Sequence, residues 1–143
     1  VPHAMPSQHA TMAATARGLG VVAPEALYAA HSLLELVLGG MKLRGAYSSL
    51  QMPPGAEKFA RHHGVSLLAL ALLGFLVLQR RLVRTEAGLV VSATLCCFHA
   101  GAVLVMVHAL HFHVVLLHLP LAIGFGLHGY ATHVNLTEKS EKS

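Results

Sequence analysis

The chain has 143 residues, of which 55% are hydrophobic and only 11% are charged, and its mean hydropathy is +0.61. Soluble domains carry about 25% charged residues, so this composition excludes an ordinary soluble domain. The net charge of +4 comes from few charges that form no basic stripe, which excludes nucleic-acid binding, and the adjacent Cys96 and Cys97 exclude a disulfide-stapled secreted domain. The class that remains is a small polytopic helical membrane protein.

An N-terminal extension precedes the apolar part of the chain. Residues 1–23 contain no acidic residue and a single Arg, Arg17, among Ala, Ser, Thr and Met. This composition is typical of organelle-targeting regions, and a leading Val indicates either a fragment or a processed mature form. We therefore expect an organellar protein, with a simple flexible terminus as the alternative.

Long apolar runs follow, and about 20 residues at 1.5 Å each are enough to cross a bilayer. Residues 87–134 contain no Lys, Arg, Asp or Glu, about twice the length of one span, so this run is divided in two. The predicted fold class is all-α, a polytopic membrane protein with four transmembrane helices in an up-down bundle over residues 24–134. The predicted spans are Pro24–Leu43, Glu57–Arg81, Thr85–His108 and Phe112–Val134.

The connections between these spans are short. The first, residues 44–56, contains Pro53-Pro54-Gly55 and suits a segment at the membrane interface. The turn between the last two spans is expected near residues 109–111, although neither Gly nor Pro marks it, and Pro120 should kink the last span. Residues 135–143 are predicted to form a charged, solvated C-terminal tail, in which residues 138–143 repeat a three-residue unit of alternating charge.

The basic residues favour one orientation in the membrane. Six of them lie on the side of the two termini and four on the side of the first and third connections. Because the inner side of a membrane protein is enriched in Lys and Arg, both termini are predicted on the matrix, stroma or cytosol side.

Twelve histidines are the outstanding feature of the composition. His99 and His118 fall at comparable depth in an antiparallel hairpin, where they could ligate one haem iron or each hold the magnesium of a chlorophyll. His31 and His128 are a second candidate pair of cofactor ligands. Five others lie at one predicted membrane face, where interfacial side chains are favoured over a metal cluster, so no metal-ion site is predicted. They are His62, His63, His108, His111 and His113.

Polar residues recur at helical period along the first span. Glu25, Tyr28, Ser32 and Glu35 stand at i, i+3, i+7 and i+10. His31 lies one turn before Glu35, so we expect a hydrogen bond between the two side chains. Ionisable groups are costly in lipid, so this stripe should face other helices or a polar cavity. It either holds helices or subunits together through a His31–Glu35 pair, or it forms a proton site beside a quinone or a cofactor contact.

Small residues at four-residue or shorter spacing indicate where helices can approach closely. They are Ala93, Cys97 and Gly101 in the third span, and Gly124, Gly126 and Gly129 in the fourth.

Short sequence features link the first two spans. Gly39-Gly40 closes the first span and is followed by Met41-Lys42-Leu43, a connection with Pro and Gly comes next, and Arg61-His62-His63-Gly64 opens the second span. In these features the chain resembles the DoxX-like group of small four-helix membrane proteins. The resemblance covers most of the chain and implies a four-helix membrane fold. Some members of that group are linked to quinone-dependent oxidation of sulfur compounds, but no catalytic residue can be carried over.

The function expected first is structural. Small size, a processed-looking N-terminus and the lack of a catalytic motif predict a non-catalytic accessory subunit of a large energy-transducing complex, in the respiratory chain of the mitochondrial inner membrane or in a thylakoid photosystem. Its partners would be other integral-membrane subunits and lipid, with chlorophyll or haem as the cofactors considered. The alternative is a small redox protein that binds haem or quinone through transmembrane histidines. A proton channel or transporter ranks third.

Overall fold

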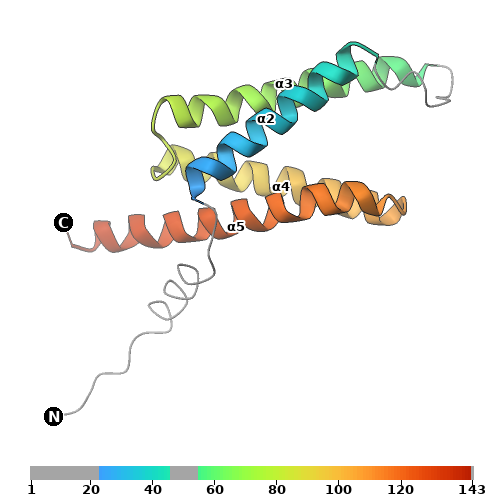
Figure 1. The fold of residues 1–143 in the computed structure, drawn as a ribbon. Helices are drawn as coiled ribbons and strands as arrows, with labels where there is room; N and C mark the ends of the chain where they lie inside the picture. The colour runs from blue at the N-terminus through green and yellow to red at the C-terminus, as the bar shows by residue number, and fades with distance from the viewer. Residues whose placement is uncertain (1–22, 46–54, 143) are drawn as a thin grey trace. The chain divides into compact units, whose positions relative to one another are not determined.

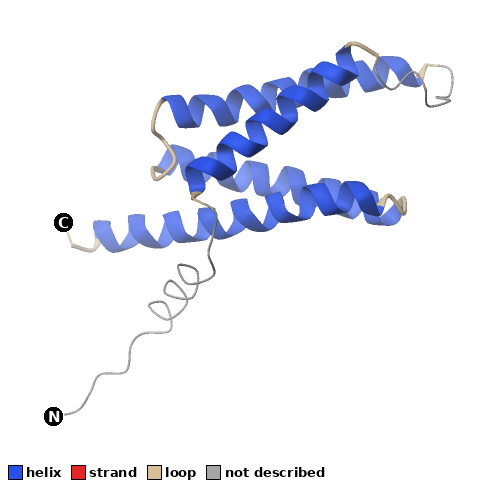
Figure 2. Cartoon of the chain, in the orientation of Figure 1, coloured by secondary structure: helices blue, strands red, loops and turns tan. Residues whose placement is uncertain are grey.

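In the part of the chain that the structure describes, helices are joined by turns and short connections (Figures 1 and 2). The structure is a computed structural model and describes residues 23–45 and 55–142. The helices in these two ranges are α2 (Pro24–Leu43), α3 (Ala56–Gln79), α4 (Glu86–His108) and α5 (Phe112–Ser140). The predicted N-terminal extension and most of the predicted interfacial connection lie outside the described residues.

The helix bounds agree with the predicted spans except at the end of α5. That helix contains Pro120 and continues past the predicted boundary at Val134 as far as Ser140. The boundary was placed where hydrophobicity ends, but residues 135–140 contain neither Gly nor Pro, so nothing local stops the helix there. The first part of the predicted tail is therefore an exposed helical extension.

Three of the four helices, α3, α4 and α5, are long and apolar enough to cross a membrane. The prediction of four spans is met for these three and not for α2, whose Glu25, His31 and Glu35 lower its hydropathy. Several polar side chains of the helices are buried, and many large apolar ones are exposed. Leu104 is 74% exposed, for example, whereas Glu35 is completely buried. Such a pattern is expected where lipid surrounds the helices.

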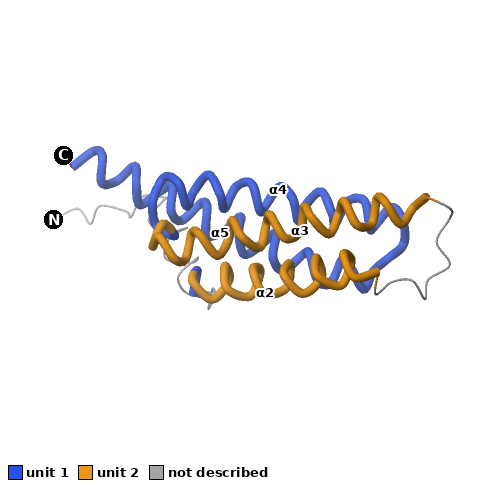
Figure 3. Tube along the Cα trace, turned by 90° about the horizontal axis from the view of Figure 1, so that it is seen from above, with its two compact units in different colours: residues 1–24, 83–143 blue, residues 25–82 orange. Residues whose placement is uncertain are grey.

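The chain divides into two compact units, coloured separately in Figure 3. One unit contains α2 and α3, within residues 25–82, and the other contains α4 and α5, within residues 83–143; they are called the α2–α3 unit and the α4–α5 unit.

Glycines set the close packing of the α2–α3 unit. A Cβ added to Gly39 would lie 2.9 Å from the carbonyl oxygen of Gly64, so the two backbones touch at this level. Toward the other end, a Cβ on Gly74 would lie 2.5 Å from Oγ of Ser32. Early residues of α2 therefore oppose late residues of α3, as in an antiparallel hairpin.

The α4–α5 unit is also an antiparallel hairpin. The buried hydroxyl of Ser92 on α4 donates a hydrogen bond of 2.7 Å to the carbonyl oxygen of Phe125 on α5. A Cβ on Gly126 would lie 3.3 Å from Sγ of Cys96, and one on Gly129 would contact Ser92. The predicted role of Gly126 and Gly129 in close helix approach matches these contacts.

The turn predicted near residues 109–111 is confirmed, and it has an unusual residue at its centre. Leu110 is left-handed, with φ of 59°. Its N–H donates to the carbonyl of Val107, and the N–H of His111 donates to the carbonyl of Met106. This is the hydrogen-bond pattern of a Schellman motif, which usually has Gly at the left-handed position.

Candidate functional site

His99 and His118 meet inside the α4–α5 unit. Their Nδ1 atoms are 2.8 Å apart, and their ring centroids are 5.1 Å apart. His99 is fully buried and His118 is 9% exposed. The hairpin thus brings together the two histidines that the sequence placed at equal depth, although they come from different helices.

Aromatic rings surround this pair. The ring of Phe125 is stacked parallel to His99 at 6.1 Å, with an interplanar angle of 1°, and is completely buried. Phe98 meets both imidazoles edge-on, at 5.1 Å from His99 and 6.3 Å from His118. These contacts fix the orientations of the two imidazole rings.

The short Nδ1–Nδ1 distance restricts the chemistry of the pair. A hydrogen bond between two neutral imidazoles needs one Nδ1–H and one bare Nδ1, so the two rings would be different tautomers. Two axial nitrogens, each about 2.0 Å from an iron, are held about 4 Å apart. A haem shared by His99 and His118 would therefore require the rings to separate.

His128 is engaged differently. Its Nε2–H donates a hydrogen bond of 3.0 Å to the carbonyl oxygen of Val83, and the hydroxyl of Thr132 donates to its Nδ1 at 3.4 Å. Both ring nitrogens are therefore used within the α4–α5 unit. His128 thus links two segments of its own unit. With these hydrogen bonds in place, no ring nitrogen is left for the predicted cofactor.

The predicted polar stripe lies on α2, in the other unit. Tyr28, His31 and Glu35 are completely buried, Ser32 is partly buried, and Glu25 is exposed. The stripe therefore faces inward over its central part and reaches solvent or the membrane surface at its start.

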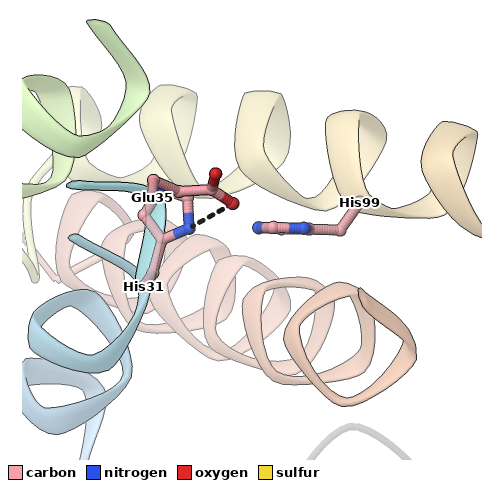
Figure 4. A group of neighbouring side chains, drawn as sticks. All are labelled: His31, Glu35 and His99. Atoms are coloured by element: carbon pink, nitrogen blue, oxygen red, sulfur yellow. Dashed lines mark ion pairs between the residues drawn. The ribbon is translucent and has the colours of Figure 1, made fainter. Parts of the chain in front are cut away.

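His31 and Glu35 form an ion-pair contact rather than the expected hydrogen bond. Nδ1 of His31 is 3.9 Å from Oε1 of Glu35, as the dashed line in Figure 4 marks. Among the described residues, neither carboxylate oxygen of Glu35 has a hydrogen-bond partner. Burying a charged carboxylate without hydrogen bonds is costly, so Glu35 is the least satisfied ionisable group of α2. Figure 4 also labels His99, which belongs to the α4–α5 unit.

An apolar groove of about 620 Å³ lies between α2 and α3. Leu33, Leu36, Leu72 and Phe75 line it, and Ser32 contributes a hydroxyl. Pockets for small molecules occupy about 300–1,000 Å³ and have mainly apolar walls. The groove suits an apolar chain such as that of a lipid.

The five histidines predicted at the membrane face are exposed or lie near an exposed turn. The rings of His111 and His113 are 5.9 Å apart, and Nζ of Lys42 donates to Nδ1 of His63 at 3.1 Å. None of these five histidines is buried.

Two buried polar residues were missed by the sequence reasoning. Ser92 and Thr132 are at most 4% exposed, and both make hydrogen bonds inside the α4–α5 unit. The missed signal was periodicity: Ser92 stands two turns before His99 on the same face of α4, and Thr132 stands one turn after His128.

The chain was also compared with known proteins. No family model, no curated protein and no solved structure matches it. The resemblance to the DoxX-like group therefore stays a prediction.

Proposed function

We propose that this chain is a non-catalytic accessory subunit of a larger membrane complex, in an organelle of the respiratory or photosynthetic type. In this proposal all four helices span the membrane in an up-down bundle. The chain supplies helical surfaces to neighbouring subunits and contacts to lipid or pigment.

The observation that favours this function is an exposed face of small residues on α4. Ala93, Cys97 and Gly101 are all exposed, and a Cβ added to Gly101 would meet no atom within 4 Å. α4 uses another face, with Ser92 and His99, to pack against α5. A face of small residues at four-residue spacing lets another helix approach closely in a membrane. A helix of a neighbouring subunit would bury it.

The side chains of α2 support its proposed place in the membrane. Leu33, Leu36 and Val37 are at least 50% exposed, while His31 and Glu35 are buried. With His31 and Glu35 buried, the middle of α2 presents these leucine and valine side chains outward, which is the arrangement that lipid requires.

The experiment compares two enlarged side chains in the native membrane. Gly101→Leu fills the small-residue face of α4, whereas Ile123→Phe enlarges an exposed residue of α5 away from it. After extraction in mild detergent and native separation by size, the unaltered chain and Ile123→Phe should migrate in a large assembly. Gly101→Leu should insert normally but migrate as a small species, since its Cβ meets nothing inside the chain. Normal assembly of Gly101→Leu would refute the proposal.

The absorption spectrum of the same native bands tests the redox alternative. A small species with a Soret band that disappears in both His99→Ala and His118→Ala would favour a haem protein. The proton channel or transporter would instead predict proton flux across vesicles that depends on Glu35.

A further inference from the structure

We propose that His99 and His118 bind one transition-metal ion of the Zn²⁺ class through their Nδ1 atoms. This inference concerns a site inside the α4–α5 unit and is independent of the proposed function. It replaces the expectation from the sequence that the chain has no metal site.

The distance between the two ring nitrogens is close to that of two ligands on one ion. Two nitrogens that are each about 2.0–2.1 Å from a tetrahedral Zn²⁺ lie about 3.3 Å apart. The observed separation is 2.8 Å. An opening of about 0.5 Å therefore seats the ion. In this proposal, rotations of the two side chains supply the shift and turn both Nδ1 lone pairs toward the ion.

His128 provides a comparison within the same unit. Its ring nitrogens contact a backbone carbonyl and a hydroxyl, which are ordinary hydrogen-bonding partners. His99 and His118 instead direct Nδ1 atoms at each other. Ionisable residues in membrane segments are rare and usually functional. A metal ion would explain why both histidines are present. Each ring can carry its proton on Nε2 and give its Nδ1 lone pair to the same ion.

The surroundings decide which class of ion is bound. Imidazole nitrogens favour Zn²⁺, Cu, Ni and Fe over Mg²⁺ and Ca²⁺, which prefer oxygen ligands. Phe98 and Phe125 hold the two imidazoles by edge and face contacts. Groups that orient the ligand rings in this way support metal binding. Water or other donors complete the coordination.

Metal binding is measured on the purified full chain in detergent. After treatment with a chelator, the chain is loaded with Zn²⁺ or Co²⁺ and the metal content is measured by mass spectrometry. We expect one ion per chain. Loss of a partner that only orients a ligand weakens metal binding about 10–100-fold, so loss of a ligand in His99→Ala or His118→Ala should weaken it by at least as much. No bound metal in the unaltered chain would overturn the proposal.

Surface histidines supply the control. The exposed rings of His111 and His113 could hold metal adventitiously. The double variant His111→Ala/His113→Ala should keep the ion. Loss of the metal there, together with retention in His99→Ala and His118→Ala, would overturn the proposal.

A thiol variant separates a metal ligand from a hydrogen-bonding partner, and it decides the question if the alanine variants fail to fold. In His118→Cys the thiolate is a good ligand for Zn²⁺ and Co²⁺ but a poor substitute in a hydrogen bond between two rings. We expect this variant to bind Co²⁺ with a sulfur-to-cobalt charge-transfer band. The absence of that band in a folded, Co²⁺-treated variant would refute coordination at this position. Because these measurements use the isolated chain, their failure is distinct from a failure of assembly in the membrane.

Discussion

At the scale of single residues, the neighbouring glycines 39 and 40 have different roles. A Cβ on Gly39 would come within 2.9 Å of the backbone oxygen of Gly64, whereas one on Gly40 meets nothing within 4 Å. Backbone cannot rotate away as a side chain can, so Gly39→Ala should force α2 and α3 apart. Overpacking of this kind costs about 1–3 kcal/mol, and we expect the free energy of unfolding to fall by that amount.

Gly40→Ala is the matched control for this prediction. It adds the same methyl group one residue further along the helix, where the methyl group has space. Because Ala has a higher helix propensity than Gly, this variant should be more stable by up to about 1 kcal/mol. Denaturant titration of both variants in detergent measures the two effects. Equal stability of Gly39→Ala and Gly40→Ala would contradict the close contact of α2 with α3.

At this scale the sequence predicts the spacing of residues along a helix. It does not predict the direction in which each side chain points. The depth of His99 and His118 followed from counting residues, but the contact between their Nδ1 atoms depends on rotamers that only the packed hairpin sets. The spacing of His31 and Glu35 was likewise predictable. Their separation of 3.9 Å, too long for the expected hydrogen bond, depends on how the two side chains turn.

At the scale of elements, helix ends were predictable where a local signal marks them. Thr85 accepts a hydrogen bond from the backbone N–H of Gly88 and caps the start of α4, as its residue type favours. The left-handed residues after α3 and α4 are Arg81 and Leu110, where glycine would be usual. The turn at Leu110 was therefore found only from the length of the apolar run.

The conformation of Leu110 gives a prediction about the α4–α5 hairpin. A left-handed backbone costs an L-residue with a Cβ about 1–2 kcal/mol, a cost that glycine avoids. Leu110 is 72% exposed, so little packing is lost when its side chain is removed. Leu110→Gly should therefore raise the free energy of unfolding by about 1 kcal/mol.

Thermal unfolding in detergent measures this effect, with Ala109→Gly as the control. Ala109 has a φ of −82°, so glycine relieves no strain there and only adds freedom to the unfolded chain. That variant should melt at a lower temperature than the unaltered protein. If Leu110→Gly also melts at a lower temperature than the unaltered protein, the left-handed conformation of Leu110 does not strain the native structure.

At the scale of the whole molecule, the proposed topology has four crossings of the membrane. Three helices qualify by length and hydropathy, and α2 does not. Hydropathy adds up all side chains of a helix and takes no account of which face they occupy. On α2 His31 and Glu35 are buried while Leu33 and Leu36 are exposed, so the average understates its compatibility with lipid. Its 20 residues would span about 30 Å, the thickness of the hydrocarbon core.

Labelling of single cysteines with a membrane-impermeant maleimide tests whether α2 crosses. Cys96 and Cys97 are first replaced by Ala, and cysteine is then placed at the exposed residues Ala23 and Arg44, which flank α2. If α2 spans the membrane, Ala23→Cys and Arg44→Cys are labelled from opposite sides. Labelling of both from one side would leave three spans and refute the four-span topology.

Two further positions give the orientation and an internal check. Glu141→Cys lies after α5 and Lys58→Cys near the start of α3, and both sites are exposed. With four spans, Glu141→Cys should share the side of Ala23→Cys, and Lys58→Cys should share the side of Arg44→Cys. The distribution of Lys and Arg predicts that the first pair lies on the matrix, stroma or cytosol side. With three spans, Glu141→Cys would instead be labelled from the side opposite to Ala23→Cys, because an odd number of crossings separates them.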